Sequence, residues 1–479
     1  MKIVLVHYHL RPGGVSQVLL QQAAALKEAG EELLVLCGEI PPRPDDWTGI
    51  SMTIIPGLHY DRFRSAETVE NLAVSIQNAI RSLWPGGADL VHVHNPLIRK
   101  NSLLIGALKI LSKDIPLLLQ NHDLAEDFRP DVYIGEEYPE NCHYGVINSR
   151  DYDFLLKAGL KPEGLHLLPN EVRKITITPG LNKTRYLYPV RGIRRKNIGE
   201  ALFLSVFLSA SAGESTVDSV AITQPPTTDQ DLPIYNRWKE IAAELQLPVE
   251  FEVGLNASFS DVMGSAKAVI TTSVKEGFGF SFLEPWTAGI PVTGRRINYV
   301  CADFEQAGVN MDALYPTLII PAEYTDAAKL EKKTTEALSR VYAAFGLPLP
   351  SGILSKLHTI LNWDLLDFGI MDEELQENIL RLVLKEEKVR EKIKMVNPFL
   401  ETLPGLYIDP AKIEFNRKAV LSAYSRENIL GTIYSAYKKT LSPVTQSISR
   451  SMLLELYIDP SRLYLSGISP AEPAPGSQK

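Results

Sequence analysis

The sequence has little cysteine and no long apolar run. Cys37, Cys142 and Cys301 are the three cysteines among 479 residues. Because they lie far apart and form no Cys-x-x-Cys pair, they indicate neither a disulfide framework nor a zinc site, and a reducing cytoplasm is the expected location. No stretch reaches the roughly 18 apolar residues that a membrane-spanning helix needs. The apolar start, residues 2–9, is too short for a signal peptide and lacks its cleavage site.

Positive charge is also in short supply. The chain has 49 Lys and Arg against 57 Asp and Glu, which gives a net charge of −8. This balance argues against a partner that is a nucleic acid or an anionic membrane. Four basic residues on or beside one apolar helix could still touch lipid, although a solvated helix face is the simpler interpretation: Arg99, Lys100, Lys109 and Lys113.

What the sequence does contain is a regular alternation of short apolar strands and helices. In the first half, it predicts strands at 2–9, 32–37, 89–94, 115–120, 144–148 and 166–168, and helices at 15–29 and 101–112. After residue 171 the alternation restarts, with strands at 185–189, 217–223, 249–253, 268–272 and 290–292, and helices at 197–208, 231–245, 259–265 and 281–288. Such βαβ units form parallel sheets whose ligands bind at the carboxyl ends of the strands. The sequence therefore predicts an α/β protein with two successive doubly wound sheets.

The expected domains are residues 1–172, 173–325, 326–440 and 441–479. The third of these is mostly helical and charged. In the fourth, the segment from Ser466 is rich in Ser, Pro, Gly and Ala and is expected to be a frayed tail. One five-residue run, Leu-Tyr-Ile-Asp-Pro, occurs at 406–410 and again at 456–460. Two copies do not make a repeat protein, and we interpret them as a reused strand-turn or helix-stop element.

The most specific motif lies between Glu276 and Glu284. The two carboxylates stand eight positions apart around a turn with glycine at 277 and 279, and the turn leads into a helix. Glycine lets backbone approach a ligand closely, and the first N–H groups of a helix attract an anion. This arrangement suits a phosphorylated sugar, with amides on phosphate and carboxylates on hydroxyls. An ordinary glycine turn before a helix is the alternative.

A second motif is the basic loop 191–197, Arg-Gly-Ile-Arg-Arg-Lys-Asn, directly after the first strand of the second sheet. Crowding four cations into six positions is unfavourable unless an anion lies among them. Arg191 and Lys196 are expected to face the same crevice as the Glu276 turn, where an arginine fork and a lysine would bind a diphosphate. The alternative is a solvated basic loop.

Three further signals are weaker. The turn at Gly13 and Gly14 precedes a helix, and His122 follows a strand, but a plain turn and a structural histidine are equally simple interpretations. His92 and His94 face one side of a strand without a third ligand nearby in sequence, which is poor support for a metal site. The acidic pair at positions 151 and 153 lies at an expected helix start, so we interpret it as an N-terminal cap rather than a metal motif.

Taken together, these motifs resemble those of the retaining nucleotide-sugar glycosyltransferases of family 4, the glycosyl transferases group 1 set. The resemblance covers about residues 1–300, with a closing helix near 425–434. It is carried by residues 12–14, 89–94, 121–123, 146–149, 168–170 and 191–197, by Ser273, and by the pair Glu276 and Glu284. The implied fold is GT-B, with two Rossmann-like domains facing a cleft, the acceptor side first and the donor side second, and a helical C-terminal extension.

The resemblance also implies roles for single residues. Arg191 and Lys196 would neutralise the leaving diphosphate, Glu276 would contact the transferred sugar, and His122 would lie beside that sugar at the reaction centre. Glu284 would contact the ribose, and Gly14 would let the first-domain loop close on the donor phosphate or the acceptor. The donor-binding set so implied is Gly13, Gly14, Ser273, Gly277, Phe278, Gly279, Phe280 and Glu284.

The implied reaction is retaining transfer of a hexose from a nucleoside diphosphate sugar to a hydroxyl acceptor, with no metal or other cofactor. Two alternatives share the fold: a sugar phosphorylase, in which phosphate uses the same clamp, and a non-catalytic sugar-nucleotide-binding protein. The sequence departs from the family pattern in three places. Pro285 is expected to kink or delay its helix, Arg295 and Arg296 add charge after a strand, and residues 322–398 are expected to be an insertion.

Overall fold

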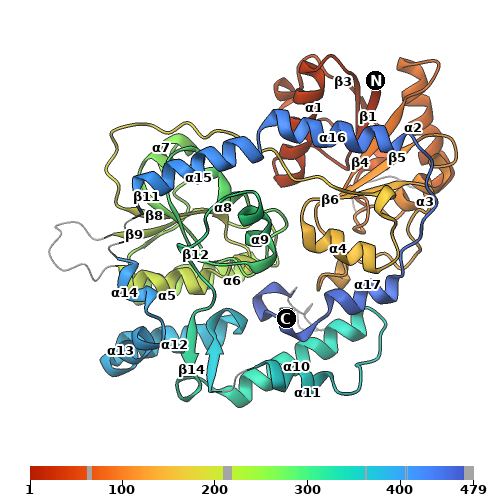
Figure 1. Ribbon diagram of the computed structural model, residues 1–479. Coiled ribbons are helices and arrows are strands. Elements are labelled where there is room, and N and C mark those ends of the chain that lie inside the picture. Colours follow the sequence, from red (N-terminus) through yellow and green to blue (C-terminus); the bar gives the residue numbers. More distant parts are fainter. Residues whose placement is uncertain (62–66, 209–217, 362–363, 405, 407, 469–479) are drawn as a thin grey trace, which may run out of the picture. The chain divides into compact units, whose positions relative to one another are not determined.

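The computed structural model describes residues 1–61, 67–208, 218–361, 364–404, 406 and 408–468 (Figure 1). The chain divides into two compact units, each built around one parallel sheet. Unit 1 holds Met1–Glu171 and Ser422–Ile458, and unit 2 holds Val172–Leu421 and the C-terminal residues from Asp459. The four domains expected from the sequence stay a prediction.

Unit 1 is a doubly wound sheet of seven parallel strands in the order β3-β2-β1-β4-β5-β6-β7. Nearly every residue of the central strands is buried, as expected for a parallel sheet covered on both faces. The strands are β1 (Lys2–Val6), β2 (Glu32–Cys37), β3 (Ser51–Ile54), β4 (Leu90–His94), β5 (Leu117–Asn121), β6 (His143–Val146) and β7 (Leu165–Leu167). The helices are α1 (Gly14–Glu28), α2 (Val69–Leu83), α3 (Leu104–Leu111), α4 (Ser149–Lys157), α16 (Arg426–Thr440) and α17 (Arg450–Tyr457).

The end of the chain is more ordered than the sequence suggested. Helix α17 lies inside the expected tail, yet Tyr457 is buried, and its hydroxyl donates to Asp151 of α4 at 2.6 Å. The expected fraying from Ser466 is wrong for residues 466–468, because Ser466 is buried and the Ile468 carbonyl accepts a hydrogen bond from Arg194 at 2.7 Å. The rest of that tail, residues 469–479, lies outside the described residues.

Unit 2 repeats the same topology. Its six parallel strands run in the order β10-β9-β8-β11-β12-β13, so the strand order reverses between β8 and β11. The strands are β8 (Arg185–Arg191), β9 (Ser219–Gln224), β10 (Val249–Glu250), β11 (Ala266–Thr271), β12 (Val292–Arg295) and β13 (Leu314–Tyr315). Helices that follow strands of this sheet are α5 (Ile198–Leu208), α6 (Leu232–Glu244), α7 (Phe259–Gly264), α8 (Phe280–Thr287) and α9 (Asn298–Gln306). The expected α/β class with two doubly wound sheets is thus confirmed.

Residues 322–398 form a further layer of unit 2. Apart from Glu200 and Ser205, helix α5 is apolar on all sides, and every one of its residues is buried, which requires cover on the face turned away from the sheet. Helix α12 supplies part of that cover (Figure 1). The layer and the chain that flanks it contain α10 (Ala327–Ala344), α11 (Ile353–Ile360), α12 (Glu373–Lys385), α13 (Glu387–Val396), α14 (Phe399–Thr402), α15 (Pro410–Ala423) and the antiparallel pair β14 (Ile319–Pro321) and β15 (Leu365–Asp367).

Two local expectations hold only in part. Helix α8 does not start late, because Pro285 is its sixth residue and removes only one internal N–H donor. The repeated Leu-Tyr-Ile-Asp-Pro run starts a helical element at each copy, and its second copy also stops one, because α17 ends at Tyr457. Pro410 begins α15 and Pro460 begins a 3₁₀ turn. The preceding Asp409 and Asp459 carboxylates accept the N–H two residues on, at 2.8 and 2.9 Å.

Candidate active site

The candidate site of unit 2 lies where its strand order reverses. Strands β8 and β11 are neighbours, and the basic loop 191–197 follows the first while the segment 272–279 follows the second. In open α/β sheets, this reversal opens a crevice at the carboxyl ends of the strands, and ligands bind there. The topology therefore brings together the two motifs that are 80 residues apart in the sequence.

Hydrogen bonds join the two loops tightly. The Tyr188 hydroxyl of β8 donates to the Lys196 carbonyl at 2.7 Å and lies 2.8 Å from the Ser273 hydroxyl. Thr272 donates to the same carbonyl at 3.0 Å, and the Val274 N–H donates to the Arg195 carbonyl at 3.1 Å. These backbone contacts fix where the Lys196 side chain starts.

The centre of the site is a buried ion pair between Lys196 and Glu276. The Lys196 ammonium donates to Glu276 Oε1, and Arg195 Nη1 lies 3.7 Å from Oε2. The side chain of Lys196 is 12% exposed and that of Glu276 is 8% exposed, whereas the Arg195 side chain is 40% exposed. Burial by itself would raise the pKa of Glu276, but the charges of Lys196 and Arg195 hold it below its usual value. Glu276 is therefore ionised at neutral pH, with one buried cation in direct contact.

The glycine turn leads into α8 as expected. Gly279 precedes the helix with φ of 90°, a left-handed conformation, and a Cβ at this position would lie 2.9 Å from Val300. Phe278 is buried, with its ring 5.0 Å from Phe280 and 5.9 Å from Phe304, so its side chain packs in the core. A ligand at the expected donor site would thus meet backbone at 278.

Glu284 lies within α8 in a desolvated position. Burial raises the pKa of Glu284 to about 7, and the charge of Arg173 opposes this shift only in part. The Nε atom of Arg173 is buried and has no hydrogen-bond partner among the described residues. Both features mark a place where a polar ligand group could pair with the protein.

We predict that Glu284 makes the protein less stable as the pH rises. Its folded-state pKa lies above the ordinary 4.5, so the free energy of unfolding falls between about pH 4.5 and about pH 7. Glu284→Gln should therefore lose less melting temperature than the wild type between about pH 5 and about pH 8. The matched control is Glu401→Gln, at an exposed position of the same unit, which should follow the wild type. Equal slopes for the wild type and Glu284→Gln would contradict the raised pKa.

The other cations of the basic loop have separate partners, so crowding does not by itself require a bound anion. Arg194 forms a bidentate pair with Glu373 of α12 at 2.6 and 2.9 Å. Arg191 Nε donates to Gln224 at the end of β9 at 3.4 Å. The structure thus brings Lys196, Arg195 and Glu276 together and holds Arg191 beside β9.

In unit 1, the expected residues follow β1 and β5. Gly13 is extended, with φ of 179°, and a Cβ at Gly14 would meet no atom within 4 Å, so the turn geometry demands glycine at neither position. His122 is buried, and its Nε2 lies 3.1 Å from His94 Nδ1. Burial lowers the pKa of His122 to about 3, which keeps the ring neutral at physiological pH.

Other sequence signals have structural explanations. The rings of His92 and His94 stack 4.4 Å apart, and within the described ranges no three His, Cys, Asp or Glu side chains form a metal-like group. The cap of α4 is Asn148 rather than Asp151, because the Asn148 side chain accepts the N–H of Asp151. Lys109 pairs with Glu136 at 3.3 Å. No described helix is long and apolar enough to span a bilayer.

Sequence reasoning missed several residues of the site. Tyr299, from α9, exchanges hydrogen bonds with the backbone of Glu276, and Arg195, which the sequence shows only within a charge run, lies beside the Glu276 carboxylate. Tyr188 and Arg173 were not singled out either. Their positions give no pattern, because each acts through a contact with a residue that is distant in the sequence.

Comparison with known proteins bears on both units. A sequence model of Glycosyltransferase Family 4 matches residues 12–170. Mannosylglucosyl-3-phosphoglycerate synthase of Petrotoga mobilis is 25% identical over 441 residues, which cover 82% of this chain and 83% of the relative. A glycosyltransferase from Rickettsia africae has a TM-score of 0.55 at 13% identity, over 92% of this chain and 98% of its own. Sucrose-phosphate synthase from Thermosynechococcus elongatus has a TM-score of 0.52 at 14% identity, over 91% and 98%.

The fold and the site at the strand-order reversal define a GT-B protein, with two Rossmann-like sheets in one chain. The family match and the homologous synthase add the chemical class. The chain is a glycosyltransferase with the GT-B fold, and its residues 12–170 match the family 4 model, in agreement with the resemblance drawn from the sequence.

Proposed function

We propose that this protein transfers a hexose from a nucleoside diphosphate sugar to a hydroxyl acceptor, with retention of the anomeric configuration. The observation that carries the proposal is the buried Lys196–Glu276 pair, flanked by Arg195, at the strand-order reversal of unit 2. A buried cation next to a carboxylate matches a ligand that is anionic at one end and rich in hydroxyls at the other. A nucleoside diphosphate sugar has both features.

In the proposed reaction, the bond between the anomeric carbon and the diphosphate oxygen breaks while the acceptor oxygen attacks from the same face. The acceptor proton passes to the departing diphosphate, so configuration is retained and no proton is left over. Lys196 stabilises the charge that develops on the leaving group, and a buried ammonium does so strongly because little water screens it. Glu276, held by Lys196 and Tyr299, orients the sugar through its hydroxyls.

We propose that this transfer needs no metal. Lys196 and Arg195 supply the positive charge that a divalent cation would otherwise provide. The acidic pair at 151 and 153 is ill suited to a metal, because Asp151 is buried and already accepts from Asn148 Nδ2 at 2.9 Å and from Tyr457 at 2.6 Å. The three buried thiols, Cys37, Cys142 and Cys301, support our proposal of a reducing cytoplasmic location.

The transferred sugar is proposed to be a hexose, in line with the name of the homologous Petrotoga synthase, whose product is a mannosylglucosyl-3-phosphoglycerate. That name also makes phosphoglycerate glycosides the first acceptor class to test. The donor and one hydroxyl acceptor are then the protein's partners.

A thermal-shift screen tests the proposal. The purified chain is mixed with UDP, GDP, ADP or inorganic phosphate, each with and without EDTA. A ligand that binds only the folded protein raises the melting temperature, and more so as its concentration exceeds its Kd. We expect one nucleoside diphosphate to stabilise the protein equally in both conditions. Stabilisation by phosphate alone would favour the phosphorylase alternative, stabilisation that EDTA abolishes would overturn metal independence, and no shift with any ligand would contradict the donor site.

A further inference from the structure

Asn197, which follows Lys196 directly, has an unusual backbone conformation. Its φ and ψ are 52° and 55°, in the left-handed region that non-glycine residues seldom adopt. This conformation ends the 3₁₀ turn Arg194–Lys196 and lets the chain enter α5, where the Glu200 N–H donates to the Asn197 carbonyl at 3.1 Å. The direction in which Lys196 leaves the loop therefore depends on how Asn197 is held.

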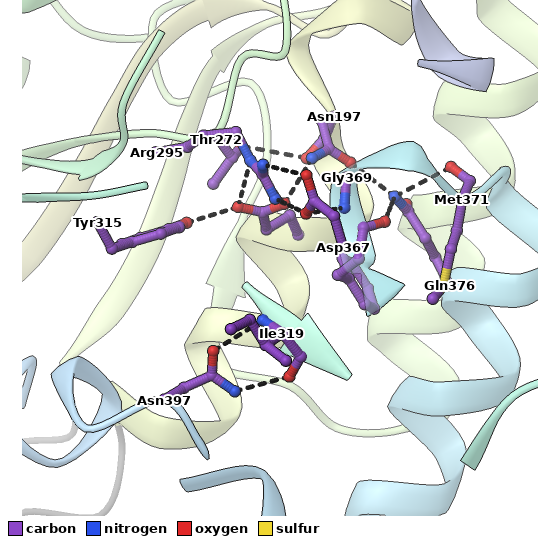
Figure 2. Close-up of polar contacts among 12 residues, drawn as sticks. Asn197, Thr272, Arg295, Tyr315, Ile319, Asp367, Gly369, Met371, Gln376 and Asn397 are labelled. Carbon is purple, nitrogen blue, oxygen red and sulfur yellow. Dashed lines mark hydrogen bonds and ion pairs between the residues drawn. The ribbon is translucent and has the colours of Figure 1, made fainter. Parts of the chain in front are cut away.

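Both ends of the Asn197 amide are bound. Its Nδ2 donates to Glu200 Oε2 at 2.7 Å, and its Oδ1 accepts from Gln376 Nε2 at 2.8 Å. Figure 2 shows Gln376 reaching Asn197 from the helical layer. All three residues are at most 2% exposed. Because a carboxylate accepts but does not donate, Glu200 fixes Nδ2 on its own side, and the atom that faces Oδ1 has to be a donor.

Gln376 is fixed as firmly as its partner. Besides Asn197, its Nε2 donates to the carbonyls of Phe368 at 3.1 Å and Met371 at 3.4 Å (Figure 2). Its Oε1 packs over Gly199 in the first turn of α5, where a Cβ would lie 2.2 Å away. The backbone of α5 and the side chain of α12 thus meet at a point that accepts no larger residue.

Glu200, which binds the other end of the Asn197 amide, is itself held by further hydrogen bonds. Arg295 donates to Glu200 through Nε at 2.9 Å and Nη2 at 2.6 Å, and Tyr315 donates to it at 2.6 Å. The same guanidinium binds Asp367 of β15 at 2.9 and 2.7 Å (Figure 2). The helical layer therefore reaches the Lys196 loop along two routes, one through Asp367 and one through Gln376.

We propose that Gln376 is a positioning residue for Lys196: by donating to Asn197, the helical layer holds the diphosphate-binding lysine in its working direction. The proposal rests on the function proposed above. It gives residues 322–398 a part in catalysis, because the layer that covers α5 also supplies the donor that orders the site. Removing this hydrogen bond leaves a buried amide oxygen unsatisfied, and the loop then relaxes away from the geometry that Lys196 needs.

The first test is Gln376→Met, which keeps the length of the side chain and removes its donor. Its matched control is Gln446→Met in unit 1, since Gln446 is 4% exposed and bonds to the Cys142 and Gly164 carbonyls at 2.9 and 3.0 Å. We expect kcat to fall about 10- to 100-fold in Gln376→Met, the acceptor KM to stay unchanged, and Gln446→Met to stay within about twofold of the wild type. Wild-type kcat and donor KM in a folded Gln376→Met would overturn the proposal.

Gln376→Glu adds a readout that a purely structural role would not move. A protonated carboxyl at 376 can donate to Asn197, whereas an ionised one repels its Oδ1. The ionisable groups around it are Glu200, reached through Asn197, and Arg194 and Glu373, which line the same small cavity. Activity relative to the wild type should therefore rise as the pH falls. If the activity of Gln376→Glu relative to the wild type does not change with pH, the proposal is contradicted. This test decides the matter even if Gln376→Met does not fold.

Failure of this inference is distinguishable from failure of the proposed function. Binding of the nucleoside diphosphate that stabilises the wild type most, out of UDP, GDP and ADP, is measured by calorimetry for Lys196→Ala, Gln376→Met and the double variant. If Gln376 acts through Lys196, its substitution weakens binding in the wild type but not in Lys196→Ala. Full binding by Lys196→Ala would refute the proposed function, whereas weak binding by Lys196→Ala with normal binding by Gln376→Met refutes only the positioning role.

Discussion

Replacing Lys196 by alanine should lower kcat about 10²- to 10³-fold, the range seen when one preorganised stabilising group is removed from an active site. The ammonium is buried against Glu276, so no solvent cation can replace it at full strength. The kcat of Glu276→Gln should fall to a similar extent, because a neutral amide binds the lysine and the sugar hydroxyls less strongly than the carboxylate does. Initial rates of sugar transfer, measured at saturating donor and acceptor, give both values.

Loss of activity must be separated from loss of fold, because Lys196→Ala leaves a buried carboxylate without its closest cation. The double variant Lys196→Met, Glu276→Gln removes both charges and should recover most of the melting temperature but none of the activity. Lys239→Ala is the control for removing a lysine from the same unit. Lys239 is 38% exposed, pairs with Glu252 at 2.8 Å, and should leave kcat unchanged. If Lys196→Ala keeps more than half of the wild-type rate, the site is wrongly assigned.

The sequence was sufficient to predict the two sheets, because parallel strands that are buried on both faces give short continuous apolar runs. The alternation predicts parallel strands, and the strand order seen in the structure brings residues 196 and 276 to neighbouring strand ends. Among the elements that were missed, β3 and α2 were missed for different reasons. Strand β3 has only four residues and no buried one, whereas α2 has a clear helical repeat of buried residues and a Thr68 cap that pattern analysis could have found.

The helical layer was harder to anticipate, since its importance lies in contacts between distant residues. Helix α5 carried a signal: an apolar helix with no polar face has to be covered on both sides, and no element of a simple doubly wound domain was left to cover it. The sequence has no such signal for the partners of Arg295. Glu200 and Asp367 are 95 and 72 residues away, and a charge after a strand is ordinarily solvated. The sequence therefore predicts Lys196 and Glu276, which the structure brings together, but not the contacts that support them.

Arg295→Met should be the most damaging substitution outside the candidate site, with a loss of about 3–5 kcal/mol in the free energy of unfolding. Arg295 is 2% exposed and binds two carboxylates, each through two hydrogen bonds or more. Although burial alone would lower it, these carboxylates hold the pKa of Arg295 well above its ordinary value. Removing the cation leaves Glu200 and Asp367 facing each other without a counterion. Urea unfolding followed by circular dichroism measures the loss.

The neighbouring Arg296 is a close control for the same substitution. It pairs with Glu305, but the two side chains are 24% and 42% exposed, and such surface pairs contribute less than about 1 kcal/mol. Arg296→Met should therefore unfold near the wild-type midpoint. If Arg295→Met is insoluble, the triple variant Arg295→Met, Glu200→Gln, Asp367→Asn should restore a folded protein, because it removes the unpaired charges with the cation. Equal midpoints for Arg295→Met and Arg296→Met would show that the buried contacts of Arg295 with Glu200 and Asp367 do not stabilise unit 2. They would also contradict the view that these contacts support the Lys196 loop.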